Sequence, residues 1–208
     1  MSARVVLASH NAHKLEELRR ILGPQIPGVE LVGYDGPEPV ENGLSFEENA
    51  LIKARAAAKH TGLPAIADDS GIAVDVLGGC PGIFSARWGG PARDDRANVD
   101  LLLWQLTDVD DAHRAAAFVC AAAFVMPGRE GGGLGEGAGL GEVCELGVWK
   151  GSVLREPRGA HGFGYDPVFR PEGEDRSAAE LSGAEKDRLS HRTRAFSALA
   201  PEMLERLR

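Results

Sequence analysis

Two adjacent carboxylates follow an apolar run in the segment AIADDSGI, residues 65–72. Successive side chains of an extended chain point to opposite faces, so Asp68 and Asp69 need not serve the same partner. Two anions held close together repel each other unless a cation lies between them. The pair therefore indicates either a helix cap that faces water or a metal site. Hard oxygen ligands of this kind suit Mg²⁺, which fills its remaining positions with water and phosphates.

The segment VVLASHNAHKLEEL, residues 5–18, indicates an anion site. An apolar strand ends in a polar turn, and a helix begins with Lys14 in its first turn. Backbone N–H groups and the helix dipole attract anions at such a junction. Ser9 and Asn11 can donate hydrogen bonds there, and Lys14 adds a full positive charge. The alternative is an N-cap serine beside a solvated lysine. The segment is not a P-loop, because the glycines and the adjacent Lys-Ser/Thr of that motif are missing.

Two aromatic residues flank a glycine in GFGYDP, residues 162–167. In an extended chain Phe163 and Tyr165 would share a face and could hold a flat ring. Asp166 would point elsewhere and could accept hydrogen bonds from the N–H edge of a base. The alternative is a Tyr-Asp-Pro turn with buried aromatic rings.

Further charged residues lie near the expected helices. Glu41 precedes one helix and Lys53 lies within it, while the late segment AEKDRLSHR contains Lys186, His191 and Arg192. Taken alone, Glu41 is most simply a loop acid, and a basic run before a helix is most simply solvated surface. These residues indicate a function only when they are considered together with the motifs above.

Alternating strands and helices must position these side chains. Strands are expected over residues 4–8, in the apolar run that ends at the acid pair, and over residues 72–76 and 142–149. Helices are expected from the polar turn to Gly23, from the serine-to-glutamate capping box at Ser45 to Gly62, over residues 94–106, and from about His191 with an interruption or kink at Pro201. The run over residues 115–126 is ambiguous, because alanine favours helix and its Phe-Val pairs favour strand. The alternation predicts an α/β fold with mixed strands.

The totals predict one domain over residues 1–208, since 208 residues with 43% hydrophobic and 26% charged content are ordinary for a globular protein. A net charge of −8 argues against a general nucleic-acid binder. No apolar run reaches the ~20 residues of a membrane span, and the N-terminus does not resemble a signal peptide. Three separated cysteines suit reduced thiols in the cytoplasm. Residues 128–141 contain eight glycines and are expected to form a flexible surface insertion.

Five segments occur in an order and spacing that resemble the inosine triphosphate pyrophosphatase family, the Ham1-like enzymes: LASHNAHK, ENGLSFEENALIKA, PAIADDSGIAVDVLGGCPGIFSAR, HGFGYDPVF and EKDRLSHR. The resemblance covers essentially the whole chain except the glycine-rich insertion. It implies a two-lobed α/β fold with a long mixed β-sheet flanked by helices and an active site in the cleft between the lobes. It also implies a Mg²⁺-dependent homodimer. Such enzymes hydrolyse ITP, dITP and XTP to the nucleoside monophosphate and pyrophosphate, which cleanses the nucleotide pool.

The resemblance also implies roles for individual residues. Residues 9–14 would form the first phosphate-binding turn, with Asn11 and Lys14 as the leading contacts. Glu41 and Asp69 would bind Mg²⁺, and Asp68 would support the metal shell. Asp69 would also be the base that activates water, or alternatively would orient a metal-bound water. The other substrate-binding residues would be Ser9, His10, Ala12 and His13 in the turn, Lys53 and Ser70 at the triphosphate, Phe163, Gly164, Tyr165 and Asp166 at the base, Lys186 at the nucleotide, and His191 and Arg192 at the purine edge.

The first turn departs from the usual family pattern, Ser/Thr-Gly-Asn-x-x-Lys with a glycine near the lysine. His10 and His13 stand in the places where glycine is usual. Glycine permits left-handed backbone and a close approach of phosphate. Histidine tolerates positive φ better than most residues and could add a donor.

Two other functions compete with this prediction. A Maf-like pyrophosphatase would act on other nucleotides, and a nucleotide-sensing module would bind without turnover. The SHR and GFGYDP motifs favour the inosine-type enzyme over the first. The presence of both metal carboxylates argues against the second. A purely structural α/β scaffold would leave the order of the five segments unexplained.

Overall fold

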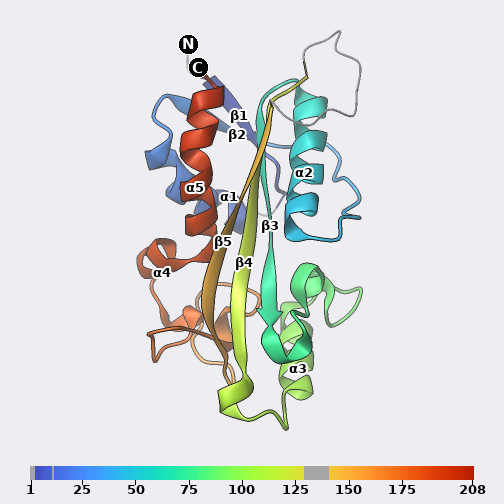
Figure 1. Ribbon diagram of the computed structural model, residues 1–208, viewed down its shortest axis with the longest axis vertical. Helices are drawn as coiled ribbons and strands as arrows, with labels where there is room; N and C mark the ends of the chain where they lie inside the picture. Colours follow the sequence, from blue (N-terminus) through green and yellow to red (C-terminus); the bar gives the residue numbers. More distant parts are fainter. Residues whose placement is uncertain (1–2, 11, 129–140) are drawn as a thin grey trace. The chain divides into compact units, whose positions relative to one another are not determined.

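The computed structural model describes residues 3–10, 12–128 and 141–208 (Figure 1), with the side chains of residues 12 and 13 left out. Most of the predicted glycine-rich insertion therefore lies outside the described residues, as does Asn11. None of the helices in the described part of the chain is long and apolar enough to cross a membrane.

A six-stranded sheet with the order β2-β1-β3-β4-β5-β6 forms the framework. Its strands are β1 (Ala3–Leu7), β2 (Val29–Gly33), β3 (Ala65–Val74), β4 (Ala115–Val125), β5 (Glu142–Val153) and β6 (Phe169–Pro171). Strand β1 pairs in parallel with β2 and β3, whereas β5 and β6 are antiparallel. The helices are α1 (Ala12–Leu22), α2 (Phe46–Thr61), α3 (Asp95–Gln105), α4 (Gly183–Leu189) and α5 (His191–Arg206). The predicted α/β fold with mixed strands is confirmed.

The chain divides into two compact units. Unit 1 comprises Met1–Asp69, Cys120–Gly147 and Arg192–Arg208, and unit 2 comprises Ser70–Val119 and Val148–His191. Strands β3, β4 and β5 each contribute residues to both units.

In unit 1 helices cover both faces of the sheet (Figure 1). Alternate β4 residues Cys120, Ala122 and Phe124 belong to one buried cluster, together with apolar residues of α1 and α5. The intervening β4 residues belong to a second cluster, whose α2 members are the alanines Ala50, Ala54, Ala57 and Ala58. This period-two alternation is what a strand covered on both faces requires.

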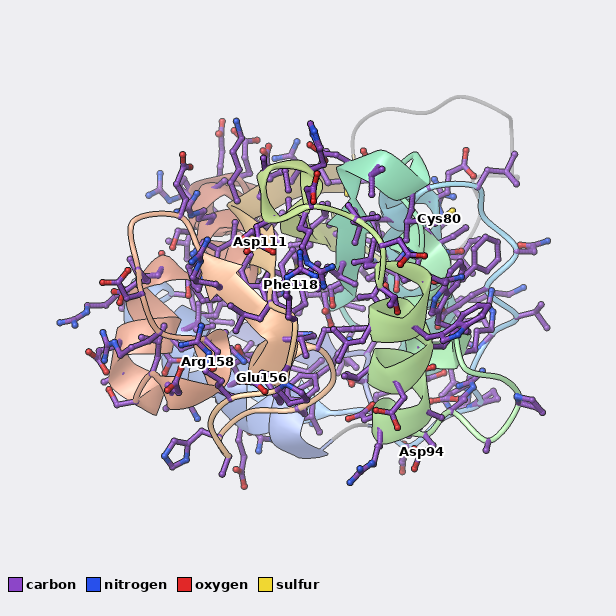
Figure 2. The ribbon with its side chains drawn as sticks, turned by 90° about the horizontal axis from the view of Figure 1, so that it is seen from below. Cys80, Asp94, Asp111, Phe118, Glu156 and Arg158 are labelled. Carbon is purple, nitrogen blue, oxygen red and sulfur yellow. The ribbon has the colours of Figure 1, made fainter. Side chains whose placement is uncertain are left out.

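The core of unit 2 is built around aromatic rings. Phe118 of β4 (Figure 2), Trp149 of β5 and Phe169 of β6 are buried in one cluster with Val99 and Leu102 of α3. The Phe118 and Phe169 ring centroids are 4.5 Å apart in an edge-on arrangement. Helix α3 begins at the N-cap Asp94, whose carboxylate accepts a hydrogen bond from the Ala97 N–H.

The predicted second helix is confirmed at both ends. The Ser45 side chain accepts a hydrogen bond from the Glu48 N–H at 3.2 Å. In a capping box the Glu48 carboxylate would accept from the N–H of Ser45 itself. Here it accepts instead from the N–H of the preceding residue, Leu44, at 2.6 Å. The C-cap Gly62 has φ 67°, the left-handed conformation that glycine adopts without strain.

Three other expectations change in the structure. The ambiguous run 115–126 is a strand, since both of its faces are buried against partners. The acid pair does not end its strand, because β3 continues through it to Val74 and absorbs the strand expected over residues 72–76. Helix α5 is not interrupted at Pro201 but continues through it, with Ala200 and Met203 on either side buried in the core.

Candidate active site

Asp68 and Asp69 meet different partners in unit 1. The register between β1 and β3 ends at Leu7 and Ile66, so the acids lie just beyond the carboxyl end of β1. Asp68 is 3% exposed and Asp69 is 9% exposed. Asp68 contacts cations from α1 and α5, whereas Asp69 contacts side chains of α2. The opposite orientation expected of neighbouring strand residues therefore gives each acid its own surroundings.

Asp68 is the centre of a buried charge network. Its Oδ2 accepts hydrogen bonds from Lys14 Nζ at 3.2 Å and from Arg192 Nε at 3.4 Å. Burial alone would raise the pKa of Asp68, but the charges of Lys14, Arg192 and Lys53 outweigh burial and hold the pKa well below its usual range. Arg192 Nη1 also donates to Glu17 Oε2 at 3.1 Å. Asp68 is thus an ionised group that orients two cations.

Asp69 faces a second group of polar side chains. Its Oδ1 accepts from Lys53 Nζ at 3.3 Å, and its Oδ2 accepts from Asn49 Nδ2 at 3.2 Å. Lys53 Nζ also lies 3.4 Å from Glu41 Oε1. Burial raises the pKa of Asp69, and the charges of Glu41 and Asp68 raise it further against the opposing effect of Lys53. Burial would lower the pKa of Lys53, but the surrounding carboxylates raise it overall.

The Glu41–Lys53–Asp69 group fits a cation. Two carboxylates from separate segments converge on one ammonium group, so the protein brings together oxygen ligands that require a positive charge between them. Among the described residues, no group of three or more His, Cys, Asp or Glu side chains is arranged so that it could hold a metal ion. One or two carboxylates, with water and phosphates completing the shell, is the usual protein contribution to a Mg²⁺ site.

The predicted phosphate-binding turn is described in part. Ser9 is half-buried, and Lys14 reaches back from α1 to Asp68. His10 is exposed, and its Nδ1 lies 2.9 Å from Glu38 Oε1. Asn11 lies outside the described residues, and so do the side chains of Ala12 and His13.

In unit 2, Lys186 and Asp166 form a buried ion pair, with Lys186 Nζ 2.5 Å from Asp166 Oδ2. The same ammonium group lies 5.3 Å from the centroid of the Phe163 ring, a cation–π geometry. Asp166 Oδ2 also accepts from the Phe163 N–H at 2.9 Å. The Gly164 N–H donates to Asp95 Oδ2 at 2.8 Å.

The extended conformation expected for GFGYDP is wrong. Gly162 and Gly164 have φ of 77° and 60°, so the segment turns instead of running straight. Tyr165 is buried, its hydroxyl donates to the Ser85 carbonyl oxygen at 2.9 Å, and burial raises its pKa. Phe163 is half-buried, so the two rings do not share one exposed face.

The remaining predicted residues lie in different units. His191 is buried in unit 2 and stacks on Phe118, with ring centroids 4.8 Å apart and an interplanar angle of 13°. Ser70 is half-buried on the part of β3 that belongs to unit 2. Arg192 belongs to unit 1, where it is bound by Asp68 and Glu17.

The interpretation of the sequence missed several partners of these residues. Asn49 lies four residues before Lys53 on α2, and Glu17 lies three residues after Lys14 on α1, so helical spacing alone places each on the face of its neighbour. Asp95, Ser85 and Glu38 carry no such local signal, because their contacts join residues distant in sequence.

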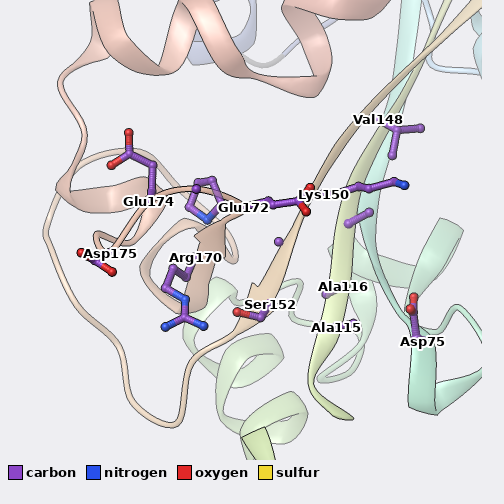
Figure 3. A pocket seen from close by; sticks show the side chains of 14 residues that line it. Asp75, Ala115, Ala116, Val148, Lys150, Ser152, Arg170, Glu172, Glu174 and Asp175 are labelled. Carbon is purple, nitrogen blue, oxygen red and sulfur yellow. The ribbon is translucent and has the colours of Figure 1, made fainter. Parts of the chain in front are cut away.

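Unit 2 also contains a pocket of about 730 Å³ on the β4–β5–β6 part of the sheet (Figure 3). Its charged lining residues are Lys150, Arg170, Asp75, Glu172, Glu174 and Asp175. In the described part of the chain, no predicted site residue lines this pocket. We therefore assign the candidate site to the carboxylate and lysine groups and not to the pocket.

The fold and the site define an α/β protein that concentrates paired carboxylates and cations just past the end of a parallel strand, the region where α/β sheets bind ligands. The Ham1 family model matches residues 5–202. A dITP/XTP pyrophosphatase of Leifsonia xyli subsp. xyli is 56% identical over 198 residues, which covers 95% of this chain and 94% of the relative. A dITP/XTP pyrophosphatase of Streptomyces avermitilis is 52% identical, with 98% of each chain covered.

Solved structures agree with the sequence comparison. A HAM1 protein from Coxiella burnetii matches with a TM-score of 0.84 and 39% identity, covering 98% of this chain and 99% of that chain. The chain belongs to the Ham1 family. The family predicted from the five segments is thereby confirmed.

Proposed function

We propose that this protein hydrolyses non-standard purine nucleoside triphosphates, ITP, dITP and XTP, to the nucleoside monophosphate and pyrophosphate. The membership in the Ham1 family and the relatives named dITP/XTP pyrophosphatase support this activity. The observation that carries it is the convergence of Glu41 and Asp69 on the ammonium group of Lys53. Asp69 directly follows Asp68, which binds Lys14 in turn. An acidic protein needs such a site to accept a substrate with roughly four negative charges.

Glu41 and Asp69 are the residues that would hold Mg²⁺. One oxygen of each carboxylate already lies within 3.4 Å of the Lys53 ammonium group, and hard oxygen ligands suit this ion. When bound, Mg²⁺ would offset the negative charge of the triphosphate. Asp68 is a less suitable ligand, because Lys14 and Arg192 already compensate its charge. We assign it the supporting role of orienting those cations.

Asp69 is the proposed base. Asn49 and Lys53 each hold one oxygen of its carboxylate, which orients the group without removing its capacity to accept another hydrogen bond. The attacking water would transfer a proton to Asp69 as its oxygen bonds to the α-phosphorus. The α–β phosphoanhydride bond breaks at the same time, and pyrophosphate leaves with the bonding electron pair.

The remaining predicted residues would bind the substrate. Residues 9–14, with Lys14, would hold the phosphates, and Lys53 and Ser70 would contact the triphosphate. Positive groups at these places would stabilise charge on the phosphoryl oxygens and on the leaving pyrophosphate. The family resemblance motivates these assignments.

Base recognition would rest on Phe163–Asp166, Lys186, His191 and Arg192. Hypoxanthine and xanthine carry an oxo group at C6, where adenine carries an amino group. A donor such as Arg192 or His191 satisfies the oxo group and leaves the amino group without an acceptor. The buried Tyr165 would support the fold of this segment by its bond to Ser85, with Phe163 as the ring that contacts the base.

We further infer from the family resemblance that the protein works in the cytoplasm as a homodimer. Free nucleotides would be its substrates, with neither nucleic acid nor a membrane as a partner. The net charge of −8 is consistent with this choice.

The deciding experiment is pyrophosphate release from ITP, dITP, XTP, GTP, ATP and UTP, each with Mg²⁺ and with EDTA. We expect metal-dependent turnover confined to ITP, dITP and XTP. Turnover mainly of UTP would favour a Maf-like enzyme instead. Nucleotide binding without any pyrophosphate release would favour a sensing module.

A further inference from the structure

The segment between β2 and α2, residues 34–45, carries Glu41 and contains no regular secondary structure. Beyond Tyr34 at its start, its large apolar side chains do not fasten it, because Val40 is 81% exposed and Leu44 is 88% exposed. A segment that buries little apolar surface opens easily unless specific contacts hold it. The position of Glu41 therefore depends on a small number of polar contacts. We call residues 34–45 the Glu41 loop.

Both ends of the Glu41 loop are anchored. At its start, Tyr34 is buried, its hydroxyl donates to the Pro37 carbonyl oxygen at 2.9 Å, and its ring packs edge-on against His60. At its end, the Gly43 N–H donates to Asn49 Oδ1 at 2.9 Å. The same Asn49 holds Asp69, so this anchor is continuous with the candidate site.

The middle of the loop is held by His10, a residue of the β1–α1 turn. His10 Nδ1 lies 2.9 Å from Glu38 Oε1, and because a carboxylate only accepts, Nδ1 is the donor. The His10 ring also lies 5.5 Å from the Tyr34 ring. His10 thus contacts the loop at two places. Glycine, the residue usual at this position in the family, could make neither contact.

We propose that Glu38 is a positioning residue, and that its hydrogen bond with His10 braces the Glu41 loop so that Glu41 stays beside Lys53 and Asp69. Glu38 lies three residues before Glu41, and three residues span at most about 10 Å, so fixing Glu38 restricts where Glu41 can go. The brace joins the proposed phosphate turn to a proposed metal ligand. It rests on the proposed function and gives a role to the histidine that replaces glycine.

The test compares Glu38→Ala and His10→Gly with the double variant. Both side chains are substantially exposed, so the contact is a modest one. We expect each single variant to raise the Mg²⁺ concentration for half-maximal pyrophosphate release from ITP by roughly two- to fivefold. In Glu38→Ala the maximal rate at saturating Mg²⁺ should stay within about twofold, because Glu38 positions a ligand and touches no reacting atom. The double variant should resemble His10→Gly, because that single variant already lacks the bond to Glu38.

Two controls separate the brace from a general loss of charge. Glu38→Gln keeps a hydrogen-bond acceptor and should restore most of the wild-type Mg²⁺ requirement. Glu30→Ala removes another exposed carboxylate of unit 1, which lies 3.9 Å from Arg4, and should change nothing. Amide hydrogen exchange of residues 35–44 in the nucleotide-free protein supplies a readout independent of activity. Exchange should be faster in Glu38→Ala and His10→Gly and unchanged in Glu30→Ala.

The outcomes distinguish the brace from the proposed function. If the wild-type protein releases no pyrophosphate from any nucleotide, the proposed function fails, and hydrogen exchange alone decides whether the brace exists. If the wild type is active but Glu38→Ala matches Glu30→Ala in both readouts, the brace is refuted. Faster exchange with an unchanged Mg²⁺ requirement would also refute it, because Glu41 would then not depend on the loop.

Discussion

At the residue scale, the two neighbouring acids of β3 have their charges compensated in different ways. Asp68 is bound by Lys14 and Arg192, whereas Asp69 shares Lys53 with Glu41. Asp68 is therefore kept ionised, and the pKa of Asp69 is raised by burial and by the nearby carboxylates. The two acids thus have different partners, and Asp69 is the one proposed as the base.

Replacing Asp69 by Asn tests this assignment. The amide keeps the size of the side chain, and its single oxygen can accept from either Asn49 or Lys53, but it cannot accept a proton. We expect ITP hydrolysis to fall at least ~100-fold, with nearly unchanged thermal unfolding. Single-turnover kinetics and a melting curve check both parts. A variant that keeps most of its turnover would remove Asp69 from the mechanism.

Arg192→Ala tests recognition of the purine edge. If Arg192 reads the C6 oxo group, the ratio of kcat/KM for ITP over ATP should narrow by roughly tenfold. Arg192 also compensates buried Asp68, so Arg192→Ala should lower the melting temperature as well. Arg192→Lys keeps the charge but loses the planar fork, and it separates the two effects. An unchanged ratio in both variants would show that Arg192 does not read the base.

At the scale of elements, helix α2 links the fold to the site. It presents alanines to the sheet and supplies both Asn49 and Lys53 to Asp69. Its position depends on its caps, which are Ser45 at the N-terminus and Gly62 at the C-terminus. Loss of either cap should therefore lower the stability of the protein. Loss of the N-terminal cap should also affect the adjoining end of the Glu41 loop.

Ser45→Ala should destabilise the protein by about 1 kcal/mol, the usual effect of removing an N-cap side chain. Ser45→Asp keeps an oxygen acceptor for the Glu48 N–H and should lose little. Denaturant unfolding of the three proteins measures the difference. Equal stability of wild type and Ser45→Ala would mean that the cap observed at α2 does not contribute to folding.

At the scale of the whole molecule, the three cysteines report on the fold from different environments. Cys120 is fully buried in β4, whereas Cys144 in β5 and Cys80 in unit 2 (Figure 2) are both half-buried. Burial raises the pKa of the Cys120 thiol. Burial, with the charges of Glu47 and Glu145, raises the pKa of Cys144 to about 11. Because the thiolate is the reactive form, a raised pKa means slow alkylation at neutral pH.

Alkylation of the native protein near pH 8 should therefore be slow at Cys144 and slower still at Cys120. The rate at Cys144 should climb as the pH rises toward about 11, where its thiolate forms. Cys120 should react only when the molecule unfolds. Mass spectrometry of peptides from native and urea-unfolded protein gives the site-specific rates. Rapid labelling of Cys144 in native protein near pH 8 would contradict the burial described for β5.

The sequence by itself determined the family, the α/β class and the opposite orientation of the two acids. These follow from local patterns: motif order, apolar periodicity, capping residues and the alternation of a strand. The capped helix from Ser45 to Gly62 shows how much such signals specify, because each cap depends on residues a few positions apart. The same holds for the helix that follows Asp94, because the N–H that this cap accepts from belongs to Ala97, only three residues on.

The tertiary structure decided which groups meet. Lys14 and Asp68 are 54 positions apart and Arg192 and Asp68 are 124 apart, so no local pattern could pair them. Burial on both faces made residues 115–126 a strand despite their alanines. Left-handed glycines turned GFGYDP away from the expected extended form and buried Tyr165. Such outcomes depend on packing and on charge compensation between distant segments, which become defined only when the chain has folded.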